Sequence, residues 1–224
     1  MKYEPCPQCR EMGRDTRGDN LVRYPDGGAH CFSCGYHEAA TVYRGKSRAP
    51  NKFIPILEET LPAANMAWLR RYGLTDEEIK THFKYAPAYN RHIFVHIGTE
   101  GEAFWEARTV NKSMPKVTSF GAKPFLVMGK GSSLVFVEDI VSAIKVARHA
   151  MVMPLFGCAA DADTITKAVN LPGVETVYVW LDDDKKTTSM EIASIAGTFK
   201  PCYHIFTAND PKEHTDEEII YLVS

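Results

Sequence analysis

Long apolar runs are missing from this sequence of 224 residues. No stretch approaches the roughly 20 apolar residues that a membrane-spanning helix needs. The first five residues, Met-Lys-Tyr-Glu-Pro, also lack the features of a signal peptide. These absences speak against a membrane protein and against secretion. We therefore expect a cytoplasmic protein with no membrane partner.

Cysteine is scarce as well, with six residues in the whole chain. Four of them form a Cys6-x-x-Cys9 pair and a Cys31-x-x-Cys34 pair, separated by 21 residues. Disulfides are rare inside cells, and four thiolates satisfy the tetrahedral preference of zinc with no open position. The array predicts a structural zinc site, with a redox dithiol or chance pairing as alternatives. The other two, Cys158 and Cys202, stand beside apolar residues and are expected to be buried free thiols.

A phosphate-binding loop of the Walker type is absent. The segment Gly-Lys-Gly-Ser-Ser at residues 129–133 comes closest. However, Pro124 stands where the first glycine of the motif belongs, and Gly131 follows Lys130 where Ser or Thr is required. We therefore expect no fused ATP-driven motor.

Acidic side chains are unevenly distributed. Residues 1–133 carry 19 basic and 14 acidic side chains, whereas residues 134–224 carry 7 basic and 14 acidic ones. A basic surface can approach phosphate groups directly, but an acidic surface needs a cation to do so. The distribution favours a phosphate-bearing partner for the first part and a bound cation for the last.

Two apolar runs in the last part each end in carboxylates. Residues 134–137 precede Glu138, and residues 177–181 precede Asp182-Asp183-Asp184. Short β-branched and aromatic runs predict strands buried on both faces, as in a parallel sheet, where ligands bind at the carboxyl ends. If the strands are neighbours, the carboxylates converge and require a hard cation such as magnesium. In an extended chain Asp182 and Asp184 would face the same way.

Further helices and strands complete an alternating α/β order. Helical patterns follow at residues 140–147, 161–169, 187–196 and 215–222, and strands at 151–156 and 203–206. Asp161 and Asp163 stand at a helix start, where carboxylates act as caps. Asp210 follows the last strand, so we expect it near the other strand-end carboxylates.

The first 132 residues divide into smaller parts. Glycines and short strands at 20–23 and 28–32 predict a ribbon held together by the metal. Residues 44–60 are rich in Pro, Ser and charge and predict a linker. Helices at 63–72 and 75–83 and strands at 91–97 and 103–110 follow. The sequence Thr-Asp-Glu-Glu at 75–78, and again at 215–218, predicts a capped helix start. The predicted domains are 1–43, 44–60, 61–132 and 133–224.

These motifs together resemble a known family. Glu138, the Asp182-x-Asp184 pair and Asn-Asp-Pro-Lys-Glu at 209–213 look like a Toprim domain, although the residues after Glu138 lack the Gly-x-x-Asp that often follows. The ribbon segment at 24–36 is similar to the N-terminal domain of phage and bacterial DNA primases. The chain as a whole resembles the primase half of phage primase-helicases.

The resemblance implies an α/β protein. A zinc ribbon would be joined by a linker to a Toprim-type catalytic core, with a small mixed α+β subdomain before the core. It further implies a stand-alone DNA primase that makes short RNA primers on single-stranded DNA by nucleotidyl transfer. Structural Zn²⁺ and catalytic Mg²⁺ or Mn²⁺ would be its cofactors. Glu138, Asp182 and Asp184 would be catalytic, and Asp210 would join them as a metal ligand.

Basic side chains would contact the substrates. By their positions in the family, Arg108, Lys112, Lys116 and Lys123 would contact nucleoside triphosphates and the product, and Arg23, His30 and Tyr36 would read the template. A separate replicative helicase would be a partner, and the host cytoplasm the location if this is a phage protein. Two alternatives stay open: a Toprim nuclease, and a non-catalytic zinc-ribbon adaptor that binds DNA or a replisome partner. A topoisomerase is disfavoured, because no room remains for its tyrosine-bearing domain.

Overall fold

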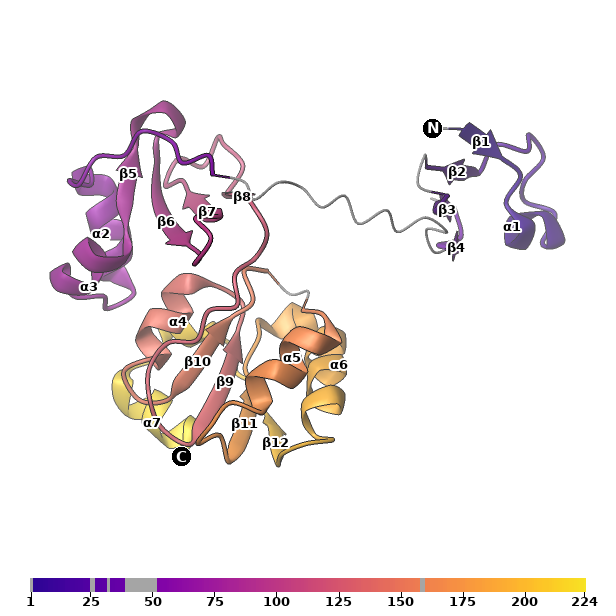
Figure 1. The fold of residues 1–224 in the computed structure, drawn as a ribbon. Helices are drawn as coiled ribbons and strands as arrows, with labels where there is room; N and C mark the ends of the chain where they lie inside the picture. Colours follow the sequence, from indigo (N-terminus) through magenta and orange to yellow (C-terminus); the bar gives the residue numbers. More distant parts are fainter. Residues whose placement is uncertain (1, 25–26, 32, 39–51, 158–159) are drawn as a thin grey trace. The chain divides into compact units, whose positions relative to one another are not determined.

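The computed structural model describes residues 2–24, 27–31, 33–38, 52–157 and 160–224. The chain forms two compact units, Met1–Ala49 and Pro50–Ser224, drawn in Figure 1. The first eight residues of the expected linker, 44–51, lie outside the described residues, as does Cys158. The four domain boundaries expected from the sequence stay predictions.

The first unit is a small antiparallel sheet with one short helix. Its strand order is β1-β2-β3-β4, and the helix α1 follows Cys6. The strands expected near residues 20–23 and 28–32 are present as β2 and β3, whereas β1, β4 and α1 were not predicted. The elements are β1 (Lys2–Glu4), α1 (Pro7–Glu11), β2 (Leu21–Arg23), β3 (Ala29–Cys31) and β4 (His37–Glu38).

The second unit begins with two helices and an antiparallel sheet of order β5-β6-β7-β8. The capping box expected at Thr75 is confirmed: Oγ1 of Thr75 accepts from the main-chain N–H of Glu78, whose carboxylate accepts from the N–H of Thr75. The elements are α2 (Ala63–Arg71), α3 (Asp76–His82), β5 (Lys84–Ala86), the 3-10 turn η1 (Pro87–Tyr89), β6 (Arg91–Ile97), β7 (Ala103–Arg108) and β8 (Val117–Phe120).

The rest of the second unit is the expected parallel α/β fold. All three strand pairs of the sheet are parallel, in the order β10-β9-β11-β12. The elements are β9 (Ser133–Val137), α4 (Ile140–Val146), β10 (Met151–Pro154), α5 (Ala162–Val169), β11 (Thr176–Val179), η2 (Asp183–Lys185), α6 (Lys186–Ala196), β12 (Cys202–His204), η3 (Pro211–Glu213) and α7 (Asp216–Val223).

Helices cover both faces of this sheet, with α4 and α7 on one side and α5 and α6 on the other (Figure 1). Val135 and Val137 of β9 pack with the first pair of helices, whereas Leu134 and Phe136 pack with the second. This alternation explains why the strand is apolar at every position. The helices α2 and α3 share the core of the α4 and α7 face.

The glycine at 129 has a packing role that differs from phosphate binding. Its φ is +74°, and a Cβ added there would lie 2.1 Å from the main-chain oxygen of Ala150. The preceding residue, Met128, makes an isolated antiparallel bridge with Val152 of β10. Close approach of two backbones therefore accounts for the glycine.

Candidate functional site

Four cysteines of the first unit form a thiolate cluster. The Sγ atoms of Cys6, Cys9, Cys31 and Cys34 all lie within 4.8 Å of one another. Two separations are 3.5 Å, between Cys6 and Cys34, and 3.7 Å, between Cys9 and Cys31. Four sulfurs at zinc–thiolate bond length have edges of about 3.8 Å. The cluster therefore fits a tetrahedral zinc ion, as the spacing predicts.

The pKa values of the thiols differ within the cluster. Burial raises the pKa of Cys6, and burial together with the neighbouring thiols raises that of Cys34 to about 12, whereas the pKa of Cys31 is lowered. The N–H of Cys9 points to the sulfur of Cys6 at 3.4 Å. Burial alone would raise the pKa of Cys31, but the backbone N–H groups of Cys34 and Ser33 bring it down to about 7. Asp15 fixes the loop by accepting from the N–H of Cys6 at 2.6 Å. Thiolate is the form that binds metal.

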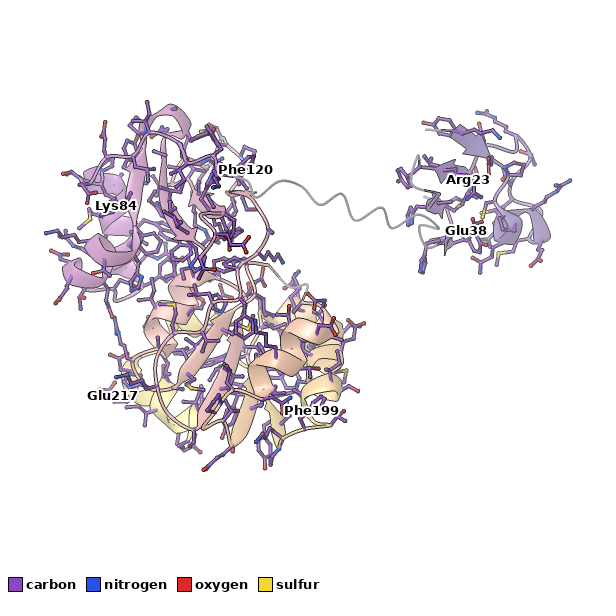
Figure 2. All side chains as sticks on the ribbon, in the orientation of Figure 1. Arg23, Glu38, Lys84, Phe120, Phe199 and Glu217 are labelled. Carbon is purple, nitrogen blue, oxygen red and sulfur yellow. The ribbon has the colours of Figure 1, made fainter. Side chains whose placement is uncertain are left out.

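The predicted template-reading residues of this unit have different surroundings. The guanidinium of Arg23 contacts Glu4 and Glu38, each at 2.8 Å, and Figure 2 labels Arg23 and Glu38 beside each other. These bonds raise the pKa of Arg23 and engage its Nε and Nη1 atoms. Tyr36 donates to Glu38 at 3.3 Å. His30 lies on β3 and is partly exposed.

The predicted carboxylates follow strands that are neighbours in the parallel sheet. β9 lies between β10 and β11 in the sheet. The chain runs from β9 to β10 on one side and then returns past β9 to β11 on the other, so the strand order reverses between β9 and β11. Glu138 comes directly after β9. The main-chain N–H of Trp180 donates to the oxygen of Phe136, which continues the pairing of β11 with β9 by one residue, and Asp182 follows shortly after. Ligands of open parallel sheets bind where the strand order reverses, at the carboxyl ends. Glu138 and Asp182 both lie at that place.

The carboxylates repel one another at this edge. Burial, followed by the charges of Glu138 and Asp210, raises the pKa of Asp182 to about 7. The Oε2 atom of Glu138 is buried without a hydrogen-bond partner. Crowded acids and an orphaned carboxylate oxygen are what an oxygen-preferring cation would relieve. Within the described residues, however, only the cysteines already stand close enough to hold an ion, so the carboxylates would have to draw together.

Asp184 is placed differently from the expectation. The chain after Asp182 is not extended but turns as η2, so the alternation that would align Asp182 and Asp184 does not apply. The side chain of Asp184 is 70% exposed and pairs with Lys185. Asp183 pairs with Lys186 at 3.0 Å. Of the Asp182-x-Asp184 pair, only Asp182 is held among the other carboxylates.

Asp139 and Lys212 belong to the site although neither was predicted as a site residue; Lys212 lies within the motif at 209–213. The Lys212 ammonium bridges Oδ2 of Asp139 at 2.7 Å and Oδ2 of Asp210 at 2.5 Å. Asp139 also caps α4 by accepting from the N–H of Ser142 at 2.8 Å. Burial would raise the pKa of Asp139, but Lys212 and Arg108 lower it. Its position directly before an apolar helical stripe was the available signal, since such residues are caps.

Two further contacts fix the segment that carries Asp210. Nε1 of the buried Trp180 donates to Oγ1 of Thr207 at 2.8 Å, and Thr207 donates to the oxygen of Asn209 at 2.8 Å. The buried Lys145 of α4 donates to the main-chain oxygens of Lys212 and His214. Asp210 is therefore placed by the sheet and by α4 together.

The predicted basic residues lie at different distances from this edge. Arg108, at the end of β7, stacks 5.2 Å from the ring of Trp68, and its charge acts on Asp139. Nζ of Lys123 lies beside Gly157, in the loop after β10. Lys112 and Lys116 are exposed in the segment before β8. Arg108 and Lys123 thus lie near the carboxylates, whereas no contact places Lys112 or Lys116 there.

A small cavity of about 10 Å³ lies behind Asp139, enough for one water molecule. Burial, with a contribution from Asp139, raises the pKa of Glu106 to about 7. Burial also lowers the pKa of His92 to about 3, and its Nε2 atom has no partner. Neither residue was predicted. The lining residues are Phe83, His92, Glu106, Arg108, Asp139, Ile140 and Val141.

In the described residues, no helix has the length and apolar character needed to cross a membrane. No protein-family model matches the chain, and no curated protein matches it. Among solved structures, the chain is similar to the crystal structure of the primase fragment of the bacteriophage T7 primase-helicase protein. The TM-score is 0.46 and the identity 16%, over 95% of this chain and 93% of that chain.

Proposed function

We propose that the chain is a DNA primase, which joins ribonucleotides into short primers on single-stranded DNA. The observation that carries the proposal is that Glu138 and Asp182 follow the strands at which the parallel sheet reverses its order, with the charges of Glu138 and Asp210 acting on Asp182. The four-thiolate unit on the same chain supports it, because the sequence resemblance joins these two features in one family. The site alone fits any magnesium-dependent reaction at phosphorus, and the resemblance selects nucleotidyl transfer.

Each side chain of the site has a proposed role. Glu138 and Asp182 would hold the divalent ion, with Glu138 or Asp182 also accepting the proton of the attacking hydroxyl. The bound magnesium would lower the pKa of the nucleotide 3′-hydroxyl and stabilise the departing pyrophosphate. Lys212 would hold the carboxylate of Asp210 in its position. Asp184 would join them only after its pair with Lys185 opens.

Basic residues of the second unit would bind the substrates. Arg108 and Lys123 have positive charges near the carboxylates, so they would hold the triphosphate of the incoming nucleotide. Lys112 and Lys116 would contact the template or the product strand, where exposed lysines act as point charges. A separate replicative helicase would supply single-stranded template.

The thiolate unit would read the template. Its zinc ion would be structural, since four cysteines leave no open coordination position. Because Glu4 and Glu38 hold the guanidinium of Arg23, and Tyr36 donates to Glu38, the first role of Arg23 and Tyr36 is to support the sheet. His30, which is partly exposed on β3, is the candidate for base contacts. Exchange of His30 for Ala should therefore alter the preferred start site more than it alters the rate.

The proposal is tested by labelled ribonucleotide incorporation on a set of single-stranded templates with magnesium. Short RNA products on some templates, and none without magnesium, are the expected result. Template cleavage without incorporation would replace the primase with a nuclease. Template binding without either reaction would leave a DNA-binding adaptor.

A further inference from the structure

Lys212 is a buried cation among the carboxylates of the parallel sheet. Its side chain is only 4% exposed, and its ammonium contacts Asp139 and Asp210. The ring of Tyr72 lies on a further side, with its centroid 5.8 Å from Nζ. A buried ion pair is strongly destabilised when one partner is lost, so these three charges form one unit.

The ammonium is held between the two carboxylates. Its Nζ atom lies 2.7 Å from Oδ2 of Asp139 and 2.5 Å from Oδ2 of Asp210. A metal ion that took Oδ2 of Asp210 as a ligand would compete with this contact.

The charges at the edge can be counted. Lys212, Arg108 and Lys123 contribute three positive charges, and those of Arg108 and Lys123 act on Glu106. When all acids are ionised, five carboxylates and three cations leave two negative charges, which one divalent ion balances. A second divalent ion would make the cluster positive and would be bound weakly. The five carboxylates are Glu106, Glu138, Asp139, Asp182 and Asp210.

We propose that Lys212 is the built-in cation of this site. It holds Asp210 in place of a second metal ion, so that the free protein binds a single divalent ion through Glu138 and Asp182. This inference rests on the proposed metal-dependent function and specifies how that site is filled. Lys212 is accordingly a positioning residue, and a second ion enters only with the phosphates of a nucleotide.

The test counts Mn²⁺ ions on the zinc-loaded full chain without nucleotide, by electron paramagnetic resonance. We expect one Mn²⁺ per chain, with the signal of an isolated ion. In Lys212→Met the carboxylate of Asp210 is released, so we expect two ions. Two ions at the roughly 4 Å of two-metal sites couple magnetically and broaden the signal.

Lys145→Met is the matched control. It also removes a buried lysine that holds the same segment, but one that donates to main-chain oxygens rather than to Asp139 or Asp210. Both variants lose one positive charge and one support of the segment, but only Lys212→Met removes the cation that contacts Asp139 and Asp210. The count should therefore stay at one in Lys145→Met.

Lys212→Met leaves Asp139 without its cation and can fail to fold, so Lys212→Gln serves as a second variant. Its side-chain amide can still donate to Asp139, and the positive charge is removed. Two coupled ions in wild type would overturn the role of Lys212 while leaving the metal site intact. One ion in folded Lys212→Gln would overturn it as well. No ion in wild type would overturn the metal site itself and with it the proposed function.

Discussion

Arg148 joins three segments of the second unit and should contribute measurably to its stability. Its guanidinium contacts both carboxylate oxygens of Glu78 at 2.7 and 2.6 Å and those of Asp216 at 2.9 and 3.0 Å. It also donates to the oxygen of Gly73 at 2.9 Å. Arg148→Met removes all of these bonds while it keeps the apolar stem of the side chain.

The size of the effect follows from exposure. The side chains of Arg148 and Glu78 are 21% and 22% exposed, and that of Asp216 is 42% exposed. Arg148→Met should lower the free energy of unfolding by about 2 kcal/mol. This is less than the roughly 3–5 kcal/mol lost when a fully buried pair is broken and more than the loss at a surface pair. For a unit of this size the melting temperature should fall by about 4–8 °C.

Arg70 provides the matched comparison. It makes the same two-pronged contact with Asp76, at 2.7 Å twice, but both side chains are more than half exposed. Arg70→Met should therefore cost less than about 0.5 kcal/mol. All three tryptophans of the chain, Trp68, Trp105 and Trp180, lie in the second unit, so their fluorescence follows its unfolding alone. Equal losses in the two variants would refute the argument from burial.

Three further predictions concern the metal, a glycine and a histidine. A strong zinc chelator should unfold the four-cysteine unit, which circular dichroism would detect. The tryptophan fluorescence of the second unit should not change, because only the first unit depends on zinc for its fold. Simultaneous loss of both signals would contradict this. Gly129→Ala should destabilise more than Gly173→Ala, since both have positive φ but only at 129 does the new Cβ meet backbone, at 2.1 Å; equal denaturation midpoints would contradict it. His92 has a pKa of about 3 in the folded protein and an ordinary value of 6.5. Between these values the unfolded chain binds one more proton than the folded chain, so the free energy of unfolding decreases as the pH is lowered. Between pH 7 and pH 5 wild type should lose about 2 kcal/mol more than His92→Gln in denaturant titrations, and parallel losses would show that His92 is not held neutral.

The sequence was sufficient wherever one local pattern determines structure. The paired cysteines, the runs at 134–137 and 177–181 and the capping boxes at Thr75 and Thr215 each specify an element without help from distant residues. β8 was missed because all four of its residues are exposed, which leaves no apolar alternation to detect.

The candidate site was predictable only in part, because part of it depends on distant residues. Asp139 and Lys212 are 73 positions apart and meet only after the sheet forms. Neither has a motif that points to the other. The turn η2 likewise moves Asp184 away from the direction that an extended chain would give it. Strand ends predict where carboxylates gather, but not which cation already accompanies them.

The central claim is that Glu138 and Asp182 hold the ion that drives nucleotide joining. Its most direct test compares magnesium-dependent ribonucleotide incorporation by Asp182→Asn and Asp183→Asn. Both exchange one carboxylate for an amide at adjacent positions, but Asp183 is exposed and pairs with Lys186. Mutation of a residue that only orients a metal ligand lowers metal affinity or activity about 10–100-fold. Because Asp182→Asn changes a ligand itself, its incorporation rate should fall by at least about 100-fold. Asp183→Asn should stay within about twofold of wild type by the same reasoning. Equal activity of the two variants would contradict the account.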